Sequence, residues 1–184
     1  ALDALKLDIP ALRGEGDQLR VVGNLPYNIS TPLIFNLLKH ATHIDDMMFM
    51  LQKEVVDRIT AEPGGKDYGR LSAMVQYYCQ TDYLMKVGPG AFNPPPKVDS
   101  AVVYLKPRTH WEVEANDVEL LSKLVAKAFS QRRKTLRNTL KDLLTVEQIE
   151  SVGINPTQRA ETLSVTDFVN LSNLLPQEET EEAG

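Results

Sequence analysis

The 184-residue sequence has little cysteine and no long apolar run. Its single cysteine, Cys79, rules out an internal disulfide framework and is typical of a protein from a reducing compartment. No apolar stretch approaches the roughly 20 residues needed to span a bilayer, and the first residues do not resemble a signal peptide. We therefore expect a soluble, cytoplasmic protein with no membrane partner.

The sequence also lacks the spacing of a metal site. Its three histidines, His40, His43 and His110, are not arranged at the intervals of metal ligands, and the lone cysteine adds no further ligand. We therefore predict no bound metal.

Charge is unevenly distributed along the chain. The formal net charge of −5 argues on average against a nucleic-acid partner. Residues 121–141, however, contain seven Lys or Arg and no acid. The end of the chain is acidic, and we expect it to be a solvated tail. Its glutamates are Glu178, Glu179, Glu181 and Glu182.

Composition and hydrophobic patterning predict a globular α/β protein. Hydrophobic residues make up 42% of the chain and charged residues 24%, which are globular proportions. Strand-like and helix-like patterns alternate before Pro107, and only helical patterns follow about Asn116. This order predicts a largely parallel sheet that ends in an antiparallel pair, with a domain boundary near 108–114. The expected strands are 19–22, 47–51, 83–87 and 101–105, although the moderate β-propensity of 47–51 leaves a helix as the alternative there. The expected helices are 71–78 and 30–39, the latter capped by Ser30 or Thr31.

The sharpest chemical signal is the quartet Asn24-Leu25-Pro26-Tyr27, which ends the first expected strand. Ligands of open α/β sheets bind beyond the carboxyl ends of the strands. One chemistry that needs groups of this kind is the methylation of an adenine amino group. Because the lone pair of that amino group is delocalised into the ring, the site must accept hydrogen bonds from its N–H groups. The Asn24 side chain and the Leu25 carbonyl, held by the stiff Pro26, are two such acceptors. Tyr27 offers a face for the base. The alternative is a plain strand-ending turn with a packed tyrosine.

A second signal is the proline-rich stretch from Phe92 to Ser100. Its three consecutive prolines exclude a helix or central strand and form a stiff loop that loses little entropy when it grips a ligand. Phe92 is suited to form the other wall of a base pocket, and Lys97 is suited to meet a phosphate. The alternative is a hairpin loop whose phenylalanine packs into the core.

A third signal is the basic stretch 121–141. Treated as one helix at about 100° per residue, it places most of its cations within one quadrant, opposite its apolar residues. Arg132 falls among the apolar positions, so we expect a break near Gln131. The absence of compensating acids favours a phosphate-contacting surface over an ordinary solvated face. The basic face comprises Lys123, Lys127, Lys134, Arg137 and Lys141.

Together these motifs resemble the KsgA/RsmA-type small-subunit ribosomal RNA adenine-N6 dimethyltransferases, and six stretches match in order. They are VVGNLPYNIS (21–30), MLQKEVVDRI (50–59), YGRLSAMVQYY (68–78), FNPPPKVDSAV (92–102), AFSQRRKTLRNTL (128–140) and GINPTQRAETLS (153–164).

The resemblance implies the C-terminal part of a Rossmann-like class I methyltransferase sheet, over 1–110, followed by a small all-α RNA-docking domain with an acidic tail, over 111–184. It implies S-adenosylmethionine as methyl donor and dimethylation of two adjacent adenosines in a 3′-terminal hairpin of small-subunit ribosomal RNA. The implied partner is the immature small ribosomal subunit, whose biogenesis the reaction accompanies. No oligomer is expected for the full-length enzyme.

The resemblance also assigns roles to individual residues. It places Asn24, Leu25, Pro26 and Tyr27 at the target adenine, with Phe92 as a stacking partner. Asp3 is expected to contact the cofactor, together with Asn24. The RNA-docking residues are expected to be Lys97, Arg132, Arg133, Lys134, Arg137 and Lys141.

One departure from the family pattern concerns the cofactor. The family's Gly-rich cofactor loop and the acidic residue that binds the cofactor's ribose precede the stretch that matches Asp3, and this sequence contains neither. Gly14–Gly16 (GEG) sits in a polar turn and lacks a strand–loop–helix setting. We therefore expect an N-terminally truncated protein that binds the cofactor weakly and is inactive alone.

Two other functions stay open at this point. One is a large-subunit antibiotic-resistance adenine methyltransferase, although the triple proline and the segment 153–164 favour the small-subunit type. The other is a ribosome-assembly factor that binds RNA without catalysis. Intact Asn24 and Tyr27 favour catalysis.

Overall fold

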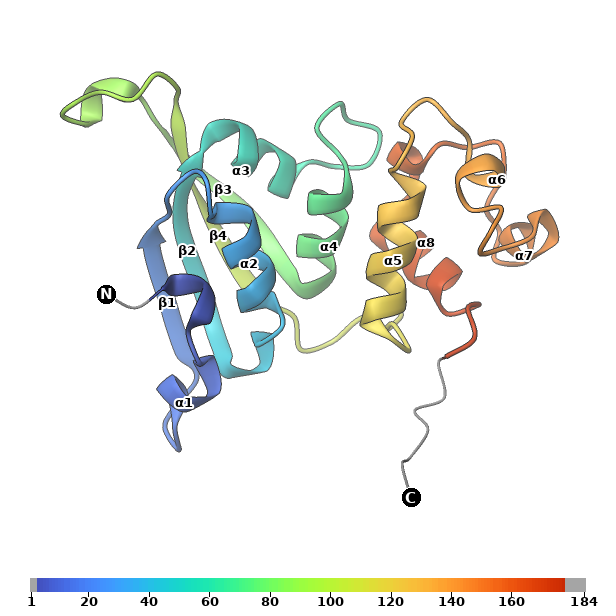
Figure 1. Ribbon diagram of the computed structural model, residues 1–184, viewed down its shortest axis with the longest axis horizontal. Helices are drawn as coiled ribbons and strands as arrows, with labels where there is room; N and C mark the ends of the chain where they lie inside the picture. Colours follow the sequence, from blue (N-terminus) through green and yellow to red (C-terminus); the bar gives the residue numbers. More distant parts are fainter. Residues whose placement is uncertain (1–2, 178–184) are drawn as a thin grey trace. The chain divides into compact units, whose positions relative to one another are not determined.

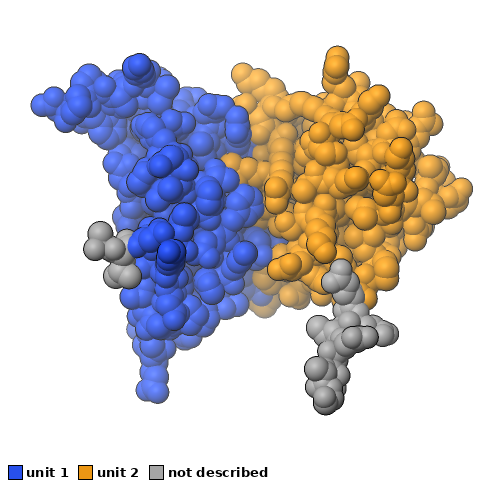
Figure 2. Space-filling view, viewed as in Figure 1, with its two compact units in different colours: residues 1–61, 75–109 blue, residues 62–74, 110–184 orange. Residues whose placement is uncertain are grey.

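The computed structural model describes residues 3–177, which form two compact units. Among the described residues, the first unit comprises 3–61 and 75–109, and the second comprises 62–74 and 110–177 (Figure 2). Residues 62–74 lie within the range predicted for the first domain, yet they belong to the second unit. The acidic tail predicted at Glu178–Glu182 lies outside the described residues.

The first unit is built on a four-stranded sheet with the order β1-β2-β4-β3 (Figure 1). Its strands are β1 (Leu19–Asn24), β2 (Ile44–Gln52), β3 (Cys79–Val87) and β4 (Ser100–Pro107). The β1–β2 pair is parallel, whereas β4 runs antiparallel to both of its neighbours. The predicted α/β class is confirmed, but two of the three pairings are antiparallel instead of largely parallel. The reason is that β4 returns from a hairpin and fills the gap between β2 and β3.

Three helices of eight or nine residues belong to the sheet region: α2 (Ser30–Leu38), α3 (Lys53–Thr60) and α4 (Arg70–Tyr78), the last of which begins in the second unit. Alternate strand residues such as Phe49 and Val103 are fully buried. The predicted serine or threonine cap of α2 is wrong: Ile29 is the cap residue and forms no side-chain cap bond. Shorter elements of this unit are α1 (Ile9–Arg13), η1 (Ala4–Lys6), η2 (Ala41–His43) and η3 (Pro89–Ala91).

Exposed side chains alternate with the buried ones along the strands. Val22 is 69% exposed and its register partner Met48 is also exposed. Nearby, the Arg20 guanidinium donates two hydrogen bonds of 2.8 and 2.9 Å to the Asp46 carboxylate, and the Tyr104 hydroxyl donates a third of 3.0 Å. The bonds from Arg20 hold the pKa of Asp46 below its usual value.

The second unit is helical. Its helices are α5 (Val118–Ala128), α6 (Leu136–Thr139), α7 (Val146–Ser151), α8 (Val165–Ser172) and the 3-10 turn η4 (Ala160–Thr162). Tyr68 lies in its core, where its hydroxyl donates a 2.7 Å hydrogen bond to the Leu163 carbonyl. The ring of Phe129 packs 6.0 Å from Tyr68 and 5.6 Å from Phe168, measured between ring centroids.

The continuous helix over 121–141 is not formed. Helix α5 ends at Ala128 because the chain turns there to pack the half-buried Phe129 against Tyr68 and Phe168, and the Ser130 hydroxyl donates to the Lys127 carbonyl. The break predicted near Gln131 is thus confirmed, but the single basic quadrant is wrong. Lys123 and Lys127 lie on α5, whereas Arg137 lies on α6 and Lys134 and Lys141 lie in the turns before and after it.

Within residues 3–177, every helix falls short of the length and apolar character needed to cross a bilayer. Over the same residues, no group of three or more His, Cys, Asp or Glu side chains is arranged to hold a metal ion.

Candidate functional site

A cavity of about 330 Å³ opens beside the end of β1 in the first unit. This volume lies at the lower end of the range of small-ligand pockets. The lining comes from two segments far apart in the sequence, the turn after β1 and the loop that joins β3 to β4. Its residues are Asn24, Leu25, Pro26, Tyr27, Phe92, Pro94, Pro96 and Ser100.

The turn after β1 is held firmly on the sheet. The Leu25 N–H continues the parallel ladder by donating a 3.1 Å hydrogen bond to the Met50 carbonyl, and the Leu25 side chain is only 8% exposed. Pro26 has no N–H, so the ladder stops there. The Pro26 carbonyl accepts a 3.2 Å bond from the Ile29 N–H, and α2 begins at the next residue.

Two hydrogen-bond acceptors of this turn are left available. The Pro26 carbonyl is bonded to Ile29, and the Tyr27 carbonyl accepts from the Ser30 hydroxyl at 3.4 Å. By contrast, no residue in the described part of the chain donates a hydrogen bond to the Leu25 carbonyl oxygen or to the Asn24 side chain. Both residues line the cavity, and these two acceptors are therefore candidates for binding an amino group there.

Aromatic and proline side chains supply the walls. Tyr27 is 44% exposed, and its hydroxyl lies 3.3 Å from the Ser100 Oγ. Phe92 is half-buried, and Pro94 and Pro96 stiffen the loop that carries it. The two rings line the same cavity, so the quartet and the loop meet although they lie far apart in the sequence.

The cavity lining is uncharged. Within the described residues, no carboxylate, imidazole, amine or guanidinium side chain contributes to it. The site therefore offers amide, carbonyl and aromatic groups for orienting a neutral ligand, and no strong acid or base for proton transfer.

Two predicted site residues lie outside this cavity lining. The Asp3 carboxylate accepts a 3.0 Å hydrogen bond from the Leu5 N–H and caps η1. Lys97 is exposed in the loop between β3 and β4. Their roles toward a cofactor and a phosphate stay predictions.

The basic turn Gln131–Lys134 of the second unit contains one restrained and two exposed cations. Arg132 Nη2 donates a 2.6 Å hydrogen bond to the Lys66 carbonyl, and Arg132 Nε lies 3.2 Å from Glu161 Oε2. The Arg133 and Lys134 side chains are exposed, and no described residue is bonded to either of them. Exposed Arg137 and Lys141 follow on either side of the α6 C-terminus.

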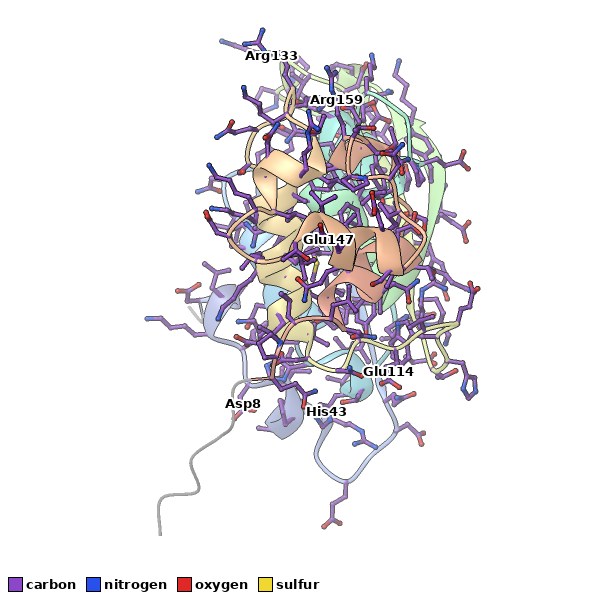
Figure 3. All side chains as sticks on the ribbon, turned by 90° about the vertical axis from the view of Figure 1, so that its right-hand side faces the viewer. Asp8, His43, Glu114, Arg133, Glu147 and Arg159 are labelled. Carbon is purple, nitrogen blue, oxygen red and sulfur yellow. The ribbon has the colours of Figure 1, made fainter. Side chains whose placement is uncertain are left out.

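Sequence reasoning missed two residues. Arg159 is exposed and lies at the same end of the second unit as Arg133, with Glu114 at the opposite end (Figure 3). A 2.8 Å hydrogen bond from the Leu136 N–H to the Gln158 carbonyl holds the two basic segments together. The signal that could have found Arg159 was its place within the matching stretch 153–164. The other missed residue is Ser100, which lies within the matching stretch 92–102 and at the junction of loop and strand.

Residues 1–177 match the family model described as ribosomal RNA adenine dimethylase. The chain belongs to this family. A ribosomal RNA small subunit methyltransferase A from Pseudomonas aeruginosa is 61% identical over 175 residues, which cover 95% of this chain. The chain spans 65% of the length of that relative.

Solved structures support the same fold. A dimethyladenosine transferase from Plasmodium falciparum superposes with a TM-score of 0.73 at 27% identity, covering 88% of this chain and 68% of the other. The 23S rRNA methyltransferase ErmE gives a TM-score of 0.68 at 22% identity, covering 95% of this chain and 70% of that one, a likeness of fold alone. These neighbours confirm the expected Rossmann-like methyltransferase fold.

Proposed function

We propose that the complete protein dimethylates N6 of two adjacent adenosines in a 3′-terminal hairpin of small-subunit ribosomal RNA, as a step of small-subunit biogenesis. The observation that carries this proposal is the pair of available acceptors, the Asn24 side chain and the Leu25 carbonyl, in a cavity walled by Tyr27 and Phe92. Family membership agrees with it.

The two acceptors act on the nucleophile. Before the first methyl transfer, adenine N6 carries two N–H groups and a lone pair conjugated with the ring; before the second, one N–H remains. Hydrogen bonds from these N–H groups to Asn24 Oδ1 and to the Leu25 carbonyl oxygen orient the amino group and direct its lone pair out of conjugation. Because the Leu25 N–H is tied to Met50, this corner does not have to reorganise during the reaction.

The rings select and hold the base. An adenosine inside a hairpin must leave its stack before its amino group can reach the cavity. Stacking on an aromatic side chain contributes about 1–3 kcal/mol per base, which offsets part of that cost. The rings of Tyr27 and Phe92 are the groups of this cavity that provide such stacking.

The residues present fit S-adenosylmethionine in part. Bound S-adenosylmethionine supplies an electrophilic methyl group. The exposed Asp3 carboxylate has lone pairs left for a cofactor amino group after its bond to Leu5, and Asn24 lies at the carboxyl end of its strand. The 184 residues do not contain the family's Gly-rich cofactor loop. We therefore expect them alone to bind this cofactor weakly and to be inactive.

The second unit is proposed to dock on the ribosomal RNA of the immature small subunit. Exposed Arg133, Lys134, Arg137 and Arg159 have no acidic side chain bonded to them within the described residues, so they are available to phosphates. Arg132 is already engaged by Lys66 and Glu161, and its contribution is therefore to hold the turn.

The test is a methyl-transfer assay with the complete protein, isolated unmethylated small subunits and isolated large subunits. Mass spectrometry of digested RNA should detect dimethyladenosine at two neighbouring positions of the small-subunit RNA only. Methylation of the large subunit would instead indicate the resistance-type activity. RNA binding with no methylation of either subunit would indicate a non-catalytic assembly factor.

A further inference from the structure

One contact of the cavity has no part in the proposed binding of the amino group. It is the 3.3 Å approach between the Tyr27 hydroxyl and the Ser100 Oγ, in which either oxygen can be the donor. The contact links the turn after β1 to the first residue of β4, two segments that no other cavity-lining pair joins by a side-chain hydrogen bond within the described residues.

The two partners differ in how firmly they are held. Ser100 is 2% exposed, and it pairs with Gln52 on one side and with Val87 on the other. Its backbone is therefore fixed between two neighbouring strands. Tyr27 is 44% exposed and lies in a turn outside the sheet ladder. Its backbone carbonyl meets the Ser30 hydroxyl, but that contact does not restrain the ring.

An exposed ring is a poor stacking partner unless its orientation is fixed. A tyrosine ring turns about two side-chain dihedrals, and each conformer that misses the base reduces the fraction of enzyme ready to react. A hydrogen bond at the far end of the ring fixes the first dihedral, because it sets where the hydroxyl oxygen lies, and thereby holds the ring in one position beside the cavity. Ser100 is the residue that provides this bond, from the most rigid part of the cavity.

We propose that Ser100 is a positioning residue, whose hydroxyl holds the Tyr27 side chain in the position from which its ring stacks on the target adenine. This inference rests on the proposed methyl-transfer function and adds a role for a residue beyond the Asn-Leu-Pro-Tyr quartet. The hydroxyl of Tyr27 then positions the side chain, and its ring stacks on the base.

The test is a double-mutant cycle in the complete protein. Tyr27→Phe and Ser100→Ala each remove one partner of the contact and keep the remaining shape. A net hydrogen bond is worth about 0.5–1.5 kcal/mol, which corresponds to a decrease of about 2- to 13-fold. We expect each single variant to lower kcat by such a factor and the double variant to be no slower than the slower single variant. The KM for S-adenosylmethionine should not change.

Three comparisons make the outcome decisive. Ser172→Ala removes another buried serine hydroxyl, one bonded to the Val169 carbonyl in the second unit, and should keep the wild-type kcat. Wild-type kcat in Tyr27→Phe, which keeps the ring of an exposed residue and should fold normally, would overturn the proposal even if Ser100→Ala were unstable. Additive losses in the double variant would also overturn it. A wild-type protein that fails to methylate RNA would instead overturn the proposed function.

Discussion

Asn24 at the end of β1 and Phe92 in the loop between β3 and β4 line the same cavity. The register of the sheet explains how they meet. Asn24 pairs with Met50 near the carboxyl end of β2, and Gln52 at that end pairs with Ser100, the first residue of β4. The loop that enters β4 is therefore delivered to the edge at which β1 and β2 finish.

Replacing Asn24 by alanine should remove one of the two acceptors for the adenine amino group. Loss of one preorganised hydrogen-bonding group from an active site costs roughly 100- to 1000-fold in kcat. We expect a decrease of that order in single-turnover methylation of small subunits. Asn36→Ala is the matched control, because Asn36 lies on α2 and bonds only the Leu5 carbonyl. Equal rates for Asn24→Ala and the wild type would contradict the role of Asn24.

Replacing Phe92 by alanine should remove one stacking surface. A loss of about 1–3 kcal/mol per base corresponds to a decrease of about 5- to 150-fold in kcat/KM for RNA. Phe92→Tyr keeps the ring and should retain most of the activity. The measurement is steady-state methylation at varied RNA concentration. If the tyrosine variant were as impaired as the alanine variant, stacking would not be the function of this side chain.

Arg132 and Arg133 are neighbours with different expected roles. Arg133→Ala should weaken RNA binding and make the slope of log affinity against log salt shallower by about 0.7–0.9, as expected for one lost phosphate contact. Its thermal stability should not change, because the side chain is exposed and bonded to no described residue.

Arg132→Ala should behave in the opposite way. It leaves the Lys66 carbonyl and the Glu161 carboxylate without their guanidinium partner, so the melting temperature should fall. The salt slope should change less than in Arg133→Ala. Filter binding at several salt concentrations and thermal unfolding of both variants separate these roles. A larger slope change for Arg132→Ala would show that Arg132 contacts phosphate directly.

Tyr68→Phe should destabilise the second unit. The substitution leaves the buried Leu163 carbonyl without its 2.7 Å donor, which costs about 1–3 kcal/mol of unfolding free energy. Tyr83→Phe changes an exposed tyrosine and serves as the control. Urea unfolding of the complete protein measures both variants. A negligible change for Tyr68→Phe would mean that water replaces the lost donor.

Asp46 should make stability depend on pH. Its bonds from Arg20 and Tyr104 lower its pKa in the folded state, so the stabilisation is fully present above the unfolded value of about 3.9. It is lost as pH falls through the lower folded pKa. The difference in unfolding free energy between the wild type and Asp46→Asn should therefore be largest near neutral pH and shrink below about pH 4.

The measurement is chemical unfolding of both proteins from pH 7 to pH 3. Asp17→Asn changes an exposed aspartate of the turn before β1 and should leave stability at pH 7 unchanged. A difference for Asp46→Asn that grows toward low pH would contradict the assigned direction of the pKa shift.

The sequence was sufficient to predict a helix or strand where the residues of that segment themselves show its pattern. The apolar run Met47–Leu51 favoured β2 with a helix as the alternative, and a proline in the first turn predicted α2. The place of Asn24 at a ligand-binding edge followed from the general position of ligand sites on such sheets. These features depend on short stretches of sequence, whereas the meeting of Asn24 with Phe92 was expected from the family resemblance.

Features that depend on distant partners were missed. The helix after Leu121 ends at Ala128 because Phe129 packs between Tyr68 and Phe168, which its local sequence does not show. Tyr68 likewise belongs to the second unit, where its hydroxyl donates a hydrogen bond to the Leu163 carbonyl. Ser100 and Arg159 gain their significance only from the register of β4 and from the pairing of Leu136 with Gln158.

The most direct test is an experimental structure of the complete protein with an RNA hairpin that carries the target adenosines and with a non-reactive cofactor analogue. We predict an extruded adenine between Tyr27 and Phe92, with its N6 atom within about 2.7–3.2 Å of Asn24 Oδ1 and of the Leu25 carbonyl oxygen. A target adenine that remains stacked in the hairpin, or whose amino group faces other acceptors, would contradict the account.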